Sequence, residues 1–175
     1  MRDIGFDYYW QDPHTKNVFA EGFEFNNHVG PIELVTAFEA FEHFTDPAAE
    51  LDKMFAISKN LLFSTLLLPE PVPKPDDWWY YGTDHGQHIA LYSSKTLRYL
   101  AQQHGTYLLS NGVDIHLFTT KQISPFFFRY LHQFSKYGLL AFVHRRMVSL
   151  TVRDRDTIAA KLNAHSPNAG GINVA

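Results

Sequence analysis

Short apolar runs and helix-like apolar stripes alternate along this chain. Two apolar runs, Ile32–Phe38 and Asn60–Leu68, are too short to form helices on their own. They predict buried strands of the parallel-sheet type, with Asn60–Leu68 at or near the centre of the sheet. The aromatic run Ile4–Trp10 predicts another buried strand, and Val18–Phe25 predicts a weaker one.

The polar residues between these runs predict where helices begin. Asp46-Pro47 is typical of a helix start, and the stripe that follows predicts a helix from about Ala48 to Ile57. Ser93 is expected to cap a second helix that runs to about His104. Strand, helix and strand in this order predict a right-handed crossover, as in doubly wound α/β folds.

The second half of the chain predicts a hairpin followed by helix. Tyr107–Leu109 and Ile115–Thr119 flank the turn residues Ser110–Gly112, which favours an antiparallel hairpin that closes the sheet. From Pro125 to about Arg146 the pattern is helical, with a basic patch near its end that comprises Arg145, Arg146, Arg153 and Arg155. This region is expected to pack on the domain or on a second copy in a homodimer, and a membrane-surface contact is the less favoured alternative.

Composition narrows the class of protein. A chain of 175 residues with 45% hydrophobic content is long enough and apolar enough for one globular domain with a core. A net charge of −3 argues against an extended nucleic-acid surface, and the absence of cysteine excludes disulfides and thiolate metal sites. No apolar stretch is long enough for a transmembrane helix, and no leader pattern opens the chain, so we expect a cytoplasmic protein.

Candidate chemistry begins where the Ile32–Phe38 strand should end. Glu39, Glu42 and His43 have the spacing i, i+3 and i+4, so a single helical turn would bring them onto one face. Two carboxylates and an imidazole suit a divalent cation or acid–base catalysis. The alternative is the solvated first turn of a helix, in which acids favour the helix dipole.

Two further segments carry candidate site residues. Asp12 stands at the end of the first predicted strand, where a carboxylate can accept hydrogen bonds from ribose hydroxyls or simply form an Asp-Pro turn. A proline-rich loop, Pro69–Pro75, leads into an aromatic stretch that contains His85 and His88. This stretch predicts either the wall of a pocket or a loop that its tryptophans anchor to the core.

Together these segments resemble the class I S-adenosylmethionine-dependent methyltransferases, within the broad group that includes the ubiquinone-biosynthesis O-methyltransferases. The resemblance covers about Ile4 to Thr119 and rests on four segments: Gly5-Phe6-Asp7 leading to Gln11-Asp12-Pro13, the run Ala37-Phe38-Glu39-Ala40-Phe41-Glu42-His43-Phe44-Thr45-Asp46-Pro47, Trp79-Tyr80-Tyr81 with Gln87-His88, and the Tyr92-Ser93 helix start. It implies a Rossmann-like α/β sheet, mostly parallel with an antiparallel last strand.

The resemblance also implies site residues and cofactors. Asp12 would hold the ribose of S-adenosylmethionine, and Ala37, Phe38 and Glu39 would lie beside its methionine part. Glu39, Glu42, His43 and His88 are similar to the metal set of the small-RNA 2′-O-methyltransferases, which implies Mg or Mn as an optional second cofactor. Glu42, His43 and His88 are the residues expected to take part in catalysis.

One departure from the family pattern concerns the cofactor's amino-acid end. The glycine-rich turn that holds it is absent, and no G-x-G segment occurs in the chain. We therefore expect an N-terminally truncated methyltransferase domain at 1–120, a C-terminal helical extension at 121–162 and a disordered tail at 163–175. The chain alone is then expected to bind S-adenosylmethionine at best in the millimolar range.

The leading functional hypothesis is O-methylation of a small hydroxylated acceptor. An acceptor hydroxyl would attack the cofactor methyl in line, helped by orientation and by a metal or His43 that lowers the hydroxyl's pKa. The alternatives are a metal-dependent hydrolase that uses Glu39, Glu42, His43 and His88, and a non-catalytic remnant or binding module.

Overall fold

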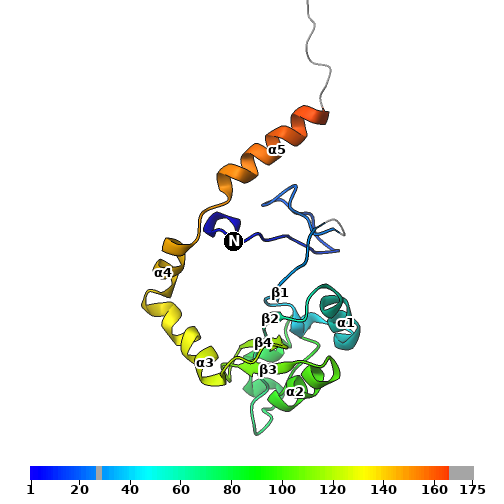
Figure 1. Ribbon diagram of the computed structural model, residues 1–175. Helices are drawn as coiled ribbons and strands as arrows, with labels where there is room; N and C mark the ends of the chain where they lie inside the picture. Colours follow the sequence, from blue (N-terminus) through cyan, green and yellow to red (C-terminus); the bar gives the residue numbers. More distant parts are fainter. Residues whose placement is uncertain (27–28, 166–175) are drawn as a thin grey trace, which may run out of the picture. The chain divides into compact units, whose positions relative to one another are not determined.

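The computed structural model describes residues 1–26 and 29–165, and the chain divides into two units. Figure 1 draws the helices and strands of both units, coloured along the sequence. We call Gly30–Tyr137 the sheet unit, and Met1–Val29 with Gly138–Ala175 the terminal unit. Of the predicted tail, residues 166–175 lie outside the described residues, and residues 163–165 belong to a helix. The predicted boundaries at 120 and 162 stay a prediction.

A four-stranded sheet forms the centre of the sheet unit. Its strands lie in the order β1-β2-β4-β3, and their bounds are β1 Val35–Ala37, β2 Leu61–Ser64, β3 Tyr107–Ser110 and β4 Ile115–Thr119. β1 pairs with β2 in parallel, whereas β4 runs antiparallel to both β2 and β3. Three strands therefore share one direction and the last one opposes them. This confirms the predicted mixed α/β sheet with an antiparallel last strand.

The two predicted helices of the sheet unit begin at their predicted caps. The Asp46 carboxylate accepts a hydrogen bond from the Ala49 N–H at 3.1 Å, and α1 runs from Pro47 to Ile57. The Ser93 hydroxyl accepts one from the Thr96 N–H at 3.1 Å, and α2 spans Ser94–Gln103. Both helices contribute to one core cluster with the sheet, whose large members are Phe41, Leu51, Phe55, Leu61, Phe63, Tyr92, Leu97 and Phe118.

The two apolar runs occupy different places in the sheet. β2 is central, as predicted, and its pairing with the chain before β4 continues after its last residue, because the N–H groups of Thr65 and Leu67 donate to carbonyls of residues 114 and 113. β1 lies at the edge of the described sheet and is shorter than predicted. With one neighbouring strand, it leaves Leu34 and Phe38 exposed instead of burying both faces.

The strand predicted at Ile4–Trp10 is wrong. Arg2–Ile4 forms a 3-10 helix that Gly5 ends with a φ of 101°, and the following aromatic residues extend without a paired strand in the described part of the chain. The one ladder contact is an isolated bridge between Trp10 and Glu24, so the weaker strand at Val18–Phe25 is also absent. Strand propensity needs a neighbouring strand before it produces a strand.

The C-terminal segment is helical but broken. α3 Pro125–Phe134 and the 3-10 turn Ser135–Tyr137 belong to the sheet unit, and Gly138, with a φ of 105°, separates them from α4 Leu139–Arg146. A further helix, α5 Thr151–His165, belongs to the terminal unit. Among the helices of the described residues, none is long and apolar enough to cross a membrane.

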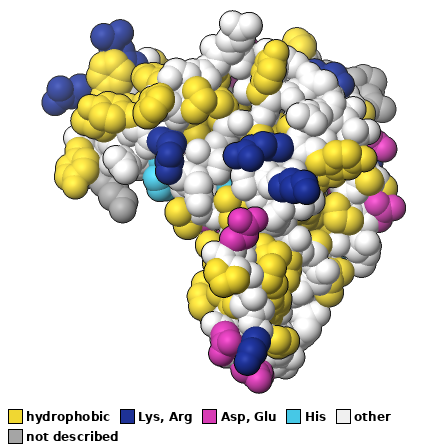
Figure 2. Space-filling view, turned by 90° about the horizontal axis from the view of Figure 1, so that it is seen from below, with side chains coloured by type: hydrophobic (Ala, Val, Ile, Leu, Met, Phe, Trp, Pro, Cys, Tyr) yellow, Lys and Arg dark blue, Asp and Glu magenta, His cyan; other side chains and the backbone are white. Residues whose placement is uncertain are grey.

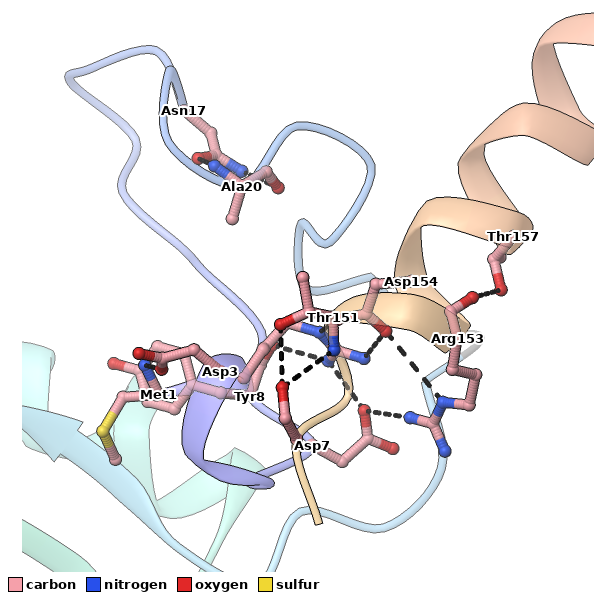
Figure 3. Close-up of polar contacts among 12 residues, drawn as sticks. Met1, Asp3, Asp7, Tyr8, Asn17, Ala20, Thr151, Arg153, Asp154 and Thr157 are labelled. Carbon is pink, nitrogen blue, oxygen red and sulfur yellow. Dashed lines mark hydrogen bonds and ion pairs between the residues drawn. The ribbon is translucent and has the colours of Figure 1, made fainter. Parts of the chain in front are cut away.

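Figure 3 draws polar contacts of the terminal unit and labels Asp7, Tyr8 and Asp154. All three residues accept hydrogen bonds from one side chain, that of Arg2. Its guanidinium donates two hydrogen bonds to Asp154 of α5, at 2.7 and 2.8 Å, and one to Asp7 at 2.7 Å. Its backbone carbonyl accepts the Leu150 N–H at 3.1 Å. Arg2 therefore connects the first residues of the chain to the start of α5.

Candidate functional site

The candidate site begins at the carboxyl ends of β1 and β2, which lie at the same edge of the sheet because these strands are parallel. Glu39 follows β1 with a φ of 50°, the sole positive φ among the described non-glycine residues. The Ser64 hydroxyl at the end of β2 accepts the Glu39 N–H at 2.8 Å and donates to the Glu39 carboxylate at 2.7 Å. Such a strained backbone, held by side-chain bonds, is typical of functional loops.

The next turn buries Glu42. Phe41–His43 forms a 3-10 helix in which the Phe41 ring stacks on Phe63 of β2, with 4.0 Å between ring centroids. This packing draws the turn into the core and leaves Glu42 with 0% exposure. Neither of its carboxylate oxygens has a hydrogen-bond partner within the described part of the chain. A buried carboxylate without a donor costs several kcal/mol, so it requires an explanation.

Two histidines face this carboxylate with their protons fixed by backbone carbonyls. His43 Nδ1 lies 2.8 Å from the Gln87 carbonyl oxygen, and His88 Nδ1 lies 2.6 Å from the Tyr80 carbonyl oxygen. A carbonyl oxygen only accepts, so each Nδ1 carries a proton and donates. In the neutral imidazoles, each Nε2 is then left with a free lone pair, which is the usual arrangement of metal-binding histidines.

The three side chains form a compact group. Glu42, His43 and His88 each offer one ligand atom, and these atoms all lie within 4.8 Å of one another. Ligands on opposite sides of one ion are up to about 4.4 Å apart, so the spacing is close to that of a metal site. Glu39 is not in the group, because Ser64 engages its carboxylate. The structure thus brings together three of the four predicted ligands.

His88 belongs to this group, and its neighbour His85 does not. The rings of His88 and His43 lie 5.2 Å apart, whereas His85 contacts His88 and not His43. His85 Nδ1 accepts the Gln87 N–H at 3.4 Å, whereas Nδ1 of His43 and of His88 donates to a carbonyl. The chain around residues 87–90 is held in place, since the N–H groups of Ile89 and Ala90 both donate to the Glu42 carbonyl.

The comparison with known families supplies what geometry alone does not. The family model of a methyltransferase domain matches residues 1–111, which is more than half of the chain. The chain belongs to this methyltransferase family. No curated protein matches it. Membership implies that the methyltransferase uses S-adenosylmethionine, and it favours methyl transfer over the hydrolase alternative.

The predicted cofactor residues of the methyltransferase lie in both units. Ala37 is buried at the end of β1, and Phe38 beside it is exposed. Asp12 belongs to the terminal unit, where its carboxylate accepts the His14 N–H at 2.8 Å and the Thr15 hydroxyl at 2.7 Å. The hydrogen bond from the His14 N–H lowers the pKa of the Asp12 carboxyl most, and the one from the Thr15 hydroxyl lowers it further. The turn alternative therefore describes its local contacts, while a role in ribose binding stays a prediction.

Sequence reasoning missed Tyr80 and Ser64. The Tyr80 hydroxyl is buried and accepts the Leu66 N–H at 3.2 Å, which connects the aromatic loop to the chain after β2. Burial raises the pKa of Tyr80, and the nearby charge of Glu42 raises it further. Burial and the same charge also raise the pKa of Tyr92. Ser64 lies in the middle of the predicted strand Asn60–Leu68, so nothing in the sequence indicated that β2 ends at Ser64 and brings it next to Glu39.

Proposed function

We propose that this methyltransferase transfers a methyl group to a hydroxyl of a small acceptor and uses a divalent cation held by Glu42, His43 and His88. The observation that carries the proposal is Glu42, a fully buried carboxylate whose oxygens make no hydrogen bond of good geometry with the described residues, although the Tyr80 hydroxyl lies close enough for Glu42 to raise its pKa. A divalent cation such as Mg or Mn compensates such a charge, and carboxylate oxygen with imidazole nitrogen is a suitable donor set.

Each side chain has a distinct part in this proposal. Glu42 supplies the negative charge, and its burial keeps competing water away. His43 and His88 supply Nε2, and each keeps its proton on Nδ1, which donates to the Gln87 carbonyl from His43 and to the Tyr80 carbonyl from His88. A bound cation would supply a positive charge that lowers the pKa of an acceptor hydroxyl, and bound S-adenosylmethionine would supply the methyl group.

The cofactor is proposed to lie along the carboxyl edge of the sheet. Ala37, Phe38 and Glu39 are the proposed neighbours of its methionine part, supported by the strained Glu39 backbone at the end of β1. Asp12 is the proposed ribose ligand, supported by a half-buried residue whose carboxylate retains acceptor capacity beyond its two turn contacts. The ubiquinone-biosynthesis group remains the proposed subfamily.

The aromatic loop is the proposed acceptor side of the site. Trp79 is 78% exposed, and a series of ring contacts runs from it through Tyr80 to His88. An exposed indole next to the histidines offers a flat apolar surface for a ring-shaped acceptor. This placement is compatible with a quinol, a sugar or a nucleoside.

A metal titration with matched histidine variants tests the proposal. Mn²⁺ binding to the 175-residue chain is followed by the electron paramagnetic resonance of free Mn²⁺. Loss of one of three protein ligands should reduce affinity at least about tenfold in His88→Ala. His85→Ala is the control, because His85 lies three residues away in the same loop but outside the group. Equal losses in both variants would contradict the cation site.

Methyl transfer is then measured with two probe acceptors, catechol and phenol, and with labelled S-adenosylmethionine at millimolar concentration, because the chain is expected to bind this cofactor at best in the millimolar range. We expect label on catechol oxygen, loss of transfer with a chelator and recovery with Mg²⁺. Transfer that persists in the chelator would contradict the proposed divalent cation. It would still support the proposed O-methylation.

A further inference from the structure

The outward face of α3 carries a continuous strip of aromatic side chains. Phe126, Tyr130 and Phe134 have the spacing i, i+4 and i+8, which places them on one face, and Phe127 lies beside them. Phe126 is 85% exposed, and the rings of Tyr130 and Phe134 lie 4.0 Å apart. We call these four residues the aromatic face.

The aromatic face is not needed for the packing of α3 within the sheet unit. The opposite side of the helix presents Phe128 and Leu131, both half-buried, and α3 contacts β3. The helix therefore already has an apolar side toward the domain. A second, solvent-exposed apolar strip marks an interaction surface rather than part of the core.

The charge of this part of the chain is as unusual as its aromatic content. No Asp or Glu occurs between Asp114 and Asp154, whereas six Lys and Arg residues do, including Lys121 and Arg129. The rest of the chain carries nine Lys and Arg residues against 18 acids. A chain that is acidic elsewhere thus has one continuous basic segment in its sequence, and Lys121 and Arg129 of this segment belong to the same unit as the aromatic face. Figure 2 shows hydrophobic and basic side chains next to one another on the face that it draws.

Charge decides between two kinds of partner for such a surface. A two-fold dimer would place the segment against its own copy, so that cations would meet cations. An anionic lipid surface offers opposite charge to the Lys and Arg residues and an apolar layer for the rings. Aromatic side chains are also the ones that favour the boundary between lipid headgroups and acyl chains.

We propose that α3 docks with its aromatic face on an anionic lipid surface, with Lys121 and Arg129 of the same unit against the headgroups. Phe126 and Tyr130 then enter the boundary between headgroups and acyl chains, and Arg129 on an adjoining side of the helix remains at headgroup level. The surface recognises lipid charge and not one particular headgroup.

Vesicle co-sedimentation of the full 175-residue chain tests this docking. Vesicles of phosphatidylcholine alone are compared with vesicles of equal parts phosphatidylcholine and phosphatidylglycerol. We expect at least tenfold stronger binding to the anionic vesicles, and binding should weaken as salt is added. Combining Phe126→Ser with Tyr130→Ser should reduce binding to the anionic vesicles at least tenfold.

Phe19→Ser is the matched control, because Phe19 is almost fully exposed but lies outside the basic segment. It should bind anionic vesicles like the unchanged chain. Equal binding to both vesicle types, no binding at all, or an unaffected double variant would overturn the proposal. So would a dimer, detected by analytical ultracentrifugation, that the double variant dissociates while vesicle binding is unchanged.

Discussion

Each unit of the molecule buries a side chain with a charged group, and the two differ in their hydrogen-bond partners. The Arg2 side chain is 12% exposed, and its guanidinium hydrogen-bonds to Asp154, Asp7 and the Tyr8 carbonyl. Glu42 is more deeply buried, and its oxygens have no such partner in the described residues. One charge is fully compensated by the protein, and the other is not.

The difference separates a structural ion pair from a site. Asp154 raises the pKa of Arg2 above its usual range, and Arg2 lowers the pKa of Asp154, so each stabilises the other's charged form. Glu42 instead affects its neighbours: burial raises the pKa of Tyr80 and of Tyr92, and the charge of Glu42 raises both further. A protein retains an uncompensated buried charge at a cost in stability, which is typical of functional positions.

Removing the compensated charge should have the largest effect on stability. Arg2→Met leaves Asp154 nearly buried without its partner, and we expect a loss of about 2–3 kcal/mol in unfolding free energy, measured by urea denaturation. The control is Arg155→Met, because Arg155 also pairs with an acid, Asp156, but on the surface. It should change stability by less than about 0.5 kcal/mol. Similar losses in both variants would show that burial of the Arg2 pair is unimportant.

Removing the uncompensated charge should have the opposite sign. In the presence of a chelator, Glu42→Gln should raise unfolding free energy by about 1–2 kcal/mol, since it relieves a buried charge without a donor. The same variant should lose any stabilisation that Mn²⁺ confers on the unchanged chain. Glu39→Gln is the control, because Ser64 already hydrogen-bonds that carboxylate. A Glu42→Gln chain less stable than the unchanged one in chelator would contradict the comparison.

A third buried titratable group, His116 of β4, should show a smaller and pH-dependent effect. Its ring is fully buried, Nε2 donates to the Thr65 carbonyl at 2.9 Å, and Nδ1 then accepts from the Ser110 hydroxyl at 2.9 Å. Burial lowers the pKa of His116 below its usual 6.5. The fold therefore keeps the His116 ring neutral and gives both of its nitrogens a hydrogen bond. This differs both from the ion pair of Arg2 and from the unpartnered carboxylate of Glu42.

The sign of the pH dependence follows from this lowered pKa. In the unfolded chain, His116 binds a proton near pH 6.5, whereas in the folded chain it does so only at lower pH. The contribution of neutral His116 to the unfolding free energy is therefore complete above that pH and is lost as the pH falls. We expect a loss of up to about 1 kcal/mol between pH 6.5 and 5.5 that is absent in His116→Gln, measured by urea denaturation at each pH. Asp154 contributes in a separate window, because its stabilisation disappears only at more acidic pH. An unchanged slope in His116→Gln would assign the effect to other groups.

Local chemistry made several elements predictable. The starts of α1 and α2 depend on the Asp46 and Ser93 side chains, which hydrogen-bond N–H groups three residues ahead. The hairpin depends on the turn at Asn111, whose side-chain oxygen accepts the N–H groups of residues 113 to 115. These contacts are local, so the order of residues determines them before the chain folds.

Long-range pairing and burial were decided by the tertiary structure. Ile4–Trp10 has the composition of a strand but lacks a strand beside it in the described fold, so its propensity is unused. Glu39 and Glu42 are alike in sequence, yet Ser64 engages one while Phe63 helps to bury the other. The carbonyl of Tyr80 similarly orients His88, whereas His85 lies outside the group. The sequence by itself determined which residue types end a strand, and only packing against distant residues decided which of them converge, because burial and hydrogen-bond partners come from other parts of the chain.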